Sequence, residues 1–108
     1  MKKFVYEYYG KGQTGEVSKE AMKQMMDKWM AWFATFKDQM VDGGNPFAPV
    51  AKTVTAQGVE TIAADKWPAT GYTIITAKDM DEATAMLKGC PVLEQKDGVV
   101  RVYEALPM

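Results

Sequence analysis

The sequence predicts a single α+β domain in which two helices cover one face of an antiparallel sheet. Three observations predict it: β-prone alternating segments at both ends, one long apolar repeat at helical spacing, and a second short helix with clear start and stop signals. With 108 residues, the chain can bury one hydrophobic core and is too short for two. We therefore expect one domain over residues 1–108.

Residues 3–9 predict the first strand, because Phe4, Tyr6 and Tyr8 alternate with other β-prone residues. Ser18 is the expected N-cap of the long helix that follows. Apolar residues at helical spacing predict that this helix runs on until Gly43-Gly44. Its expected core stripe is Met22, Met25, Met26, Trp29, Phe33, Phe36 and Met40.

Residues 51–57 and 59–63, rich in Thr and Val, predict a short hairpin, and an apolar strand follows at 72–77. Asp79 and Glu82 have capping-box spacing and open the second helix, which Gly89 and Pro91 end. Residues 99–106 predict the last strand. The resulting order is strand, long helix, hairpin, strand, short helix, strand.

The second face of the sheet is only partly polar. In the last strand Val99, Tyr103 and Ala105 share that face with Arg101, whereas a solvated face alternates cleanly between apolar and polar residues. We expect a second copy of the chain to cover this face, giving a two-fold homodimer. The alternative is a monomer that exposes some apolar area.

Composition excludes several classes of function. A net charge of -1 gives no electrostatic footprint for nucleic acid or for an anionic membrane surface. The chain has no histidine, so His-based acid/base catalysis, Ser-His-Asp triads and His-containing metal sites are excluded. No phosphate loop, metal-ligand cluster or dinucleotide motif occurs, and we expect no cofactor and no metal. One cysteine and no signal-peptide or membrane-spanning pattern indicate a cytoplasmic protein.

Five short segments follow one another along the chain: Trp29-Met30-Ala31-Trp32-Phe33, Gly43-Gly44, Gly71-Tyr72-Thr73-Ile74-Ile75, Asp81-Glu82-Ala83 and Cys90-Pro91. As an ordered set, they resemble the YCII-related (DGPF) domain family over nearly the whole chain. The family's name-giving Asp-Gly-Pro-Phe is replaced in this sequence by Asp65-Lys66-Trp67-Pro68, which keeps an Asp and a Pro and has Trp as its aromatic residue. The resemblance implies a ferredoxin-like βαββαβ fold in a dimeric α+β barrel. Some family members look like enzymes that use a His-Asp pair, and that mechanism cannot apply to a chain without histidine.

The resemblance also implies that the loop carrying Asp65 lines a cleft between the sheet and the long helix. Asp65 is then a general base or a ligand anchor, or else it only hydrogen-bonds backbone in its turn. Trp32, at the edge of the helical stripe, and Trp67, on the loop, are the expected walls of an apolar pocket. Trp29 is expected in the core.

Two further residues have alternative interpretations. Arg101 needs either a carboxylate partner, for which Glu7 on the neighbouring strand is expected, or an anionic ligand. Cys90 lies just past a helix C-terminus, where the helix dipole disfavours a thiolate, so we expect a packing residue and not a nucleophile.

Two functions follow. The first is a non-catalytic binding or accessory module whose cleft holds a small apolar or aromatic molecule. Its expected ligand-binding residues are Tyr8, Trp32, Asp65, Trp67 and Tyr72. The alternative is a histidine-independent lyase or isomerase, with Asp65 as general base and Tyr72 or Tyr8 as proton donor.

Overall fold

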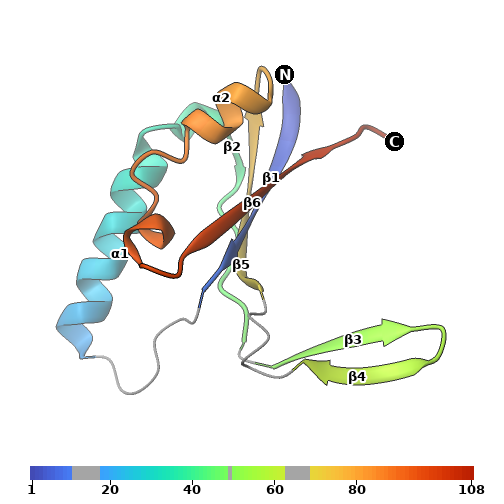
Figure 1. The fold of residues 1–108 in the computed structure, drawn as a ribbon. Coiled ribbons are helices and arrows are strands. Elements are labelled where there is room, and N and C mark those ends of the chain that lie inside the picture. Colours follow the sequence, from blue (N-terminus) through green and yellow to red (C-terminus); the bar gives the residue numbers. More distant parts are fainter. Residues whose placement is uncertain (11–17, 49, 63–68) are drawn as a thin grey trace.

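Four antiparallel strands form the main sheet, and two helices lie on one of its faces (Figure 1). A computed structural model describes residues 1–10, 18–48, 50–62 and 69–108. The order of strands across the sheet is β2-β5-β1-β6, which is the ferredoxin-like arrangement and confirms the predicted fold class. The elements of this layer are β1 (Lys2–Tyr9), α1 (Lys19–Ala34), β2 (Met40–Asp42), β5 (Ala69–Ala77), α2 (Met80–Ala85) and β6 (Val99–Ala105).

The core lies between the helices and the inner face of the two central strands. Strand β1 turns Phe4, Tyr6 and Tyr8 toward the helices, and all three are buried. Strand β5 pairs with β1 in register, so that Thr73 lies opposite Tyr6 and Ile75 lies opposite Phe4 on the same face. The strict alternation of a strand therefore predicts this half of the core correctly.

Helix α1 ends at Ala34, eight residues before the predicted end at Asp42. Ser18 caps it as expected, since its Oγ accepts a hydrogen bond from the Ala21 amide at 3.1 Å. Beyond the helix a short 3-10 turn, η1 (Lys37–Gln39), leads into β2, which adds to the edge of β5. Phe36, directly before this turn, is still buried in the core, and this is why the apolar repeat continues past the end of the helix.

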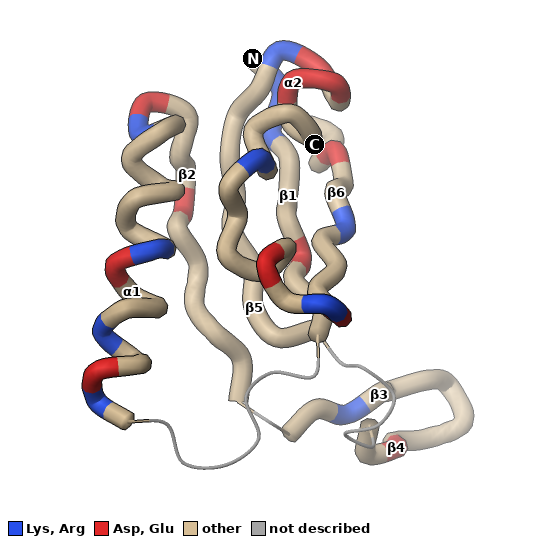
Figure 2. The backbone as a smooth tube through the Cα atoms, turned by 60° about the vertical axis from the view of Figure 1, so that its left-hand side comes forward, with Lys and Arg blue, Asp and Glu red and all other residues tan. Residues whose placement is uncertain are grey.

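The core face of α1 is also narrower than predicted. Met22 and Met26 are more than half exposed, whereas Trp32 is buried and Trp29 and Phe33 are partly buried. Positively and negatively charged residues alternate along the exposed side of α1, whereas β5 carries no charged residue (Figure 2). No helix in the described part of the chain is long and apolar enough to cross a membrane.

The predicted hairpin forms, but it does not belong to the main sheet. Strands β3 (Ala51–Thr55) and β4 (Gly58–Ile62) pair with each other in a separate two-stranded sheet. This sheet projects away from the body of the molecule (Figure 1). The second strand of the βαββαβ order is therefore β2, in a segment that was predicted to belong to the long helix.

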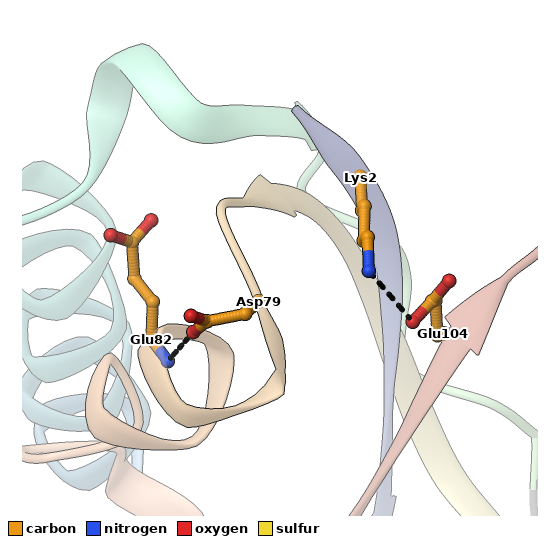
Figure 3. Close-up of polar contacts among 4 residues, drawn as sticks. All are labelled: Lys2, Asp79, Glu82 and Glu104. Carbon is orange, nitrogen blue, oxygen red and sulfur yellow. Dashed lines mark hydrogen bonds and ion pairs between the residues drawn. The ribbon is translucent and has the colours of Figure 1, made fainter.

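Helix α2 begins where the sequence predicts but ends at Ala85, before the predicted stop at Gly89, and residues 86–89 form a turn. The Asp79 carboxylate accepts a hydrogen bond from the Glu82 amide at 2.9 Å, as an N-cap should (Figure 3). Gly89 adopts a positive φ of 89° after the helix, and Pro91 begins a 3-10 turn, η3 (Pro91–Glu94). At the same end of the sheet Lys2 and Glu104 form an ion pair at 3.9 Å between β1 and β6 (Figure 3).

Candidate functional site

A cavity of about 770 Å³ lies between α1 and the sheet. Its described lining comes from α1, from the ends of β1 and β5, from the loop after β2, and from η3. Its size is within the range of pockets that bind small organic molecules. The ferredoxin-like order creates this site, because it places the central strands β1 and β5 directly under the long helix.

Aromatic side chains form the wall that α1 contributes. Trp29 and Phe33 lie one helical turn apart, with ring centroids 5.7 Å from each other. Trp29 also meets the ring of Tyr8 edge-to-face at 5.1 Å, which joins the helix wall to the sheet. Edge-to-face contacts of this kind stabilise the arrangement of the rings beyond the area they bury. The cavity therefore has a mostly apolar wall with a fixed geometry.

A chain of hydroxyl groups lies beside that wall. The Tyr8 hydroxyl donates a hydrogen bond to Thr73 Oγ1 at 2.6 Å, and the Thr73 hydroxyl donates to the carbonyl oxygen of Gly43 at 2.9 Å. Tyr8 is 4% exposed and Thr73 is 0% exposed. Burial raises the pKa of Tyr8 well above its usual value, although the hydrogen bond to Thr73 acts in the opposite direction. The phenol is thus neutral at physiological pH.

Glycines leave room at the base of the cavity. Gly71 takes an inward-facing position directly opposite Tyr8 in the β1–β5 pairing. Gly44, in the loop after β2, has a φ of 78°, which L side chains rarely adopt. A Cβ atom at Gly44 would also lie 1.6 Å from the carbonyl oxygen of Tyr72. Only glycine at position 44 therefore lets this loop approach β5.

The rim of the cavity is polar and electrically balanced. Lys28 of α1 and Glu94 of η3 form an ion pair at 2.9 Å, and both side chains are exposed. Gln24 and Gln95 are further exposed polar residues of the lining. Among the described lining residues, Lys28 and Glu94 are the charged ones, and they neutralise each other. The described part of the lining therefore carries no net charge.

The predicted ligand-binding residues are only partly brought together. Tyr8 and Tyr72 both line the cavity. The Tyr72 ring stacks on Phe47 at 5.7 Å, and its hydroxyl donates to the Asp42 carboxylate at 3.3 Å. Asp65 and Trp67 lie outside the described residues, so their assignment to the site stays a prediction.

The two tryptophans of α1 exchange their expected positions. Trp32, expected at the pocket wall, is 3% exposed within the core and donates its indole N–H to the Met86 carbonyl oxygen at 3.0 Å. Trp29, expected in the core, lines the cavity together with Phe33. Thr73, which also lines the cavity, was not predicted from the sequence. Its signal was available, since a threonine at an inward-facing position between apolar residues of a buried strand needs a hydrogen-bond partner.

Arg101 lies opposite Glu7 in the strand pairing, but the expected ion pair does not form among the described residues. The Arg101 guanidinium instead lies 4.7 Å from the ring centroid of Tyr9. Glu7 accepts a hydrogen bond from the Tyr9 hydroxyl, and this bond raises the pKa of Tyr9. This charged cluster occupies the outer face of the sheet and is exposed at Arg101.

Cys90 is buried in the core, and burial raises the pKa of its thiol to about 11. A thiol with that pKa is protonated at neutral pH and is a poor nucleophile. This agrees with the packing role that the sequence predicts. Within the described ranges, no group of three or more Cys, Asp or Glu residues is arranged to hold a metal ion.

No known protein family matches the chain, and no curated protein matches it either. Among solved structures, the chain is similar to a 5-chloro-2-hydroxyhydroquinone dehydrochlorinase from Burkholderia phenoliruptrix in complex with 2,5-dihydroxybenzoquinone. The two chains share 19% identity over 92% of this chain and 90% of the other, with a TM-score of 0.49. This likeness is too distant to assign a ligand or a reaction to this chain.

Proposed function

We propose that the protein is a non-catalytic binding or accessory module that holds a small apolar or aromatic molecule between α1 and the sheet. The observation that carries this proposal is the cavity of about 770 Å³ with Trp29 and Phe33 in its wall. Small-molecule sites combine a mostly apolar lining with a few placed polar groups. Here the polar groups are the hydroxyls of Tyr8 and Thr73.

The proposal includes a homodimer, membership of the YCII-related family and a cytoplasmic location. The dimer is supported by an apolar row across three strands of the outer face, where Val5 lies opposite both Ile74 and Tyr103. A second copy of the sheet would cover this row. Light scattering should then give twice the chain mass of 12.0 kDa. Val5→Asp should give monomers, and Met30→Asp, on the exposed side of α1, should leave dimers.

Ligand binding is tested by calorimetric titration with a panel of neutral one- and two-ring aromatic molecules. We expect at least one of them to bind, and we expect Trp29→Ala to weaken that binding about tenfold or more, because it removes part of the apolar wall. Met30→Ala is the matched control, since Met30 belongs to the same helix but is exposed and does not line the cavity. Equal losses in both variants, or no binding by any member of the panel, would contradict the proposal.

A further inference from the structure

The hydroxyl chain in the cavity has a fixed direction. Gly43 contributes a carbonyl oxygen, which can only accept a hydrogen bond. The single hydroxyl hydrogen of Thr73 is therefore used in its 2.9 Å bond to Gly43. Thr73 Oγ1 has no second hydrogen to offer, so in the 2.6 Å bond between the two side chains Tyr8 must be the donor.

This direction determines what Tyr8 can offer a ligand. The phenolic hydrogen points to Thr73, so the Tyr8 oxygen has only lone pairs left for a partner in the cavity. Among the described residues no group donates a hydrogen bond to that oxygen. Donation of its own hydrogen also polarises the oxygen and makes it a better acceptor.

From this arrangement we infer the chemical class of the ligand: a small aromatic or apolar molecule that presents an O–H or N–H donor to Tyr8 Oη. The inference rests on the proposed function and adds to it the kind of polar group that the ligand must present. A ligand of the same shape without a donor would leave the Tyr8 oxygen facing an ether or carbonyl oxygen, and two acceptors do not bond. Such a mismatch in a buried site is a common source of ligand discrimination.

The test compares 4-nitrophenol, kept at a pH below its own pKa, with 4-nitroanisole, in which a methyl group replaces the hydroxyl hydrogen. Equilibrium dialysis with an absorbance readout gives both dissociation constants. We expect the wild-type protein to bind the phenol about five- to tenfold more tightly, which is the effect of one hydrogen bond. In Tyr8→Phe that ratio should fall to about one.

Two further variants distinguish the effect of the direction of the Tyr8–Thr73 hydrogen bond from the effect of the shape of the cavity. Thr73→Val removes the acceptor of the Tyr8 hydrogen, so that Tyr8 can donate into the cavity and the preference for the phenol should shrink or reverse. Tyr6→Phe is the matched control, because Tyr6 lies two residues away on the same face, donates to the Ala83 carbonyl oxygen and does not line the cavity. It should keep the wild-type ratio.

Each outcome bears on one of the two claims. Equal binding of both molecules by the wild-type protein would overturn the inference and leave the proposed function standing. A preference for the phenol that survives in Tyr8→Phe would also overturn it, since shape alone would then explain the selection. Failure of both molecules to bind would count against the binding function itself and would remove the inference with it.

Discussion

Tyr8 and Tyr9 are neighbours in the sequence and lie on opposite faces of β1, in two very different environments. Tyr8 faces inward, is buried, and donates to a neutral hydroxyl, that of Thr73. Tyr9 faces outward, donates to the carboxylate of Glu7, and lies under the guanidinium of Arg101. The pKa of both phenols is raised, in Tyr8 mainly by burial and in Tyr9 mainly by the hydrogen bond to Glu7.

The difference shows how a strand separates two kinds of polar chemistry. An unpaired charge is very costly in a buried site, and neutral hydroxyls are tolerated there when each has a partner. The inner face accordingly uses a short hydroxyl chain that ends on a backbone carbonyl. The outer face, which remains in contact with water in the single chain, uses ionised groups. The inner arrangement suits a neutral ligand, and the outer one suits a surface contact.

The largest contrast is expected between Phe4 and Val5, which also point to opposite faces of β1. Phe4 is fully buried, so Phe4→Ala should lower the free energy of unfolding by about 3–5 kcal/mol. Val5→Ala should cost about 1 kcal/mol or less in the single chain, since Val5 is only partly buried. Urea unfolding at low protein concentration measures both values. Similar losses would mean that the two faces are equally buried.

A smaller effect is expected in the hydroxyl chain. Thr73→Val leaves the Tyr8 hydrogen without an acceptor and should cost about 1–3 kcal/mol, whereas Tyr8→Phe should cost about 0.5–1.5 kcal/mol. Because the two groups are bonded, the double variant should lose less than the sum of the single losses. Thermal or urea unfolding of the wild-type protein, the two single variants and the double variant measures these losses. Strictly additive losses would show that the bond is absent in solution.

The smallest effect is expected in how the free energy of unfolding depends on pH under alkaline conditions. The pKa values of Tyr6 and Tyr8 are raised in the folded protein, mainly by burial. The stability this contributes is fully present below the ordinary tyrosine pKa of about 10 and is lost as pH rises through the folded values. The free energy of unfolding should therefore fall above about pH 10 and fall less steeply in Tyr8→Phe. An unchanged slope in that variant would contradict the burial of the phenol.

Much of the fold can be predicted from the sequence because strands and caps are local signals. The alternation in β1 and the Asp79–Glu82 cap each depend on a few neighbouring residues, and both are found as predicted. The end of α1 is different. Phe36 faces the core from an irregular segment, and it continues the helical repeat although the helix has already ended at Ala34.

The site is less predictable than the fold for a similar reason. Trp29 and Trp32 have equally apolar surroundings in the sequence, and the part of the sheet that lies beneath each of them decides which one meets the cavity. Trp32 packs against Tyr6 and Phe36 in the core, whereas Trp29 packs against Tyr8 and lines the cavity. Tyr8 was predicted as a ligand-binding residue, and it lines the cavity. The roles predicted for Asp65 and Trp67 stay open, since these residues lie outside the described part of the chain.

The most direct test of a ligand site between α1 and the sheet is an NMR titration that follows the indole N–H signals, assigned with single Trp→Phe variants. With 4-nitrophenol as the probe, the Trp29 signal should shift and saturate, because its ring lines the cavity. The Trp32 signal should move much less, because its N–H is held by the Met86 carbonyl oxygen within the core. A saturating shift at Trp32 with none at Trp29, or no shift at either, would contradict the account.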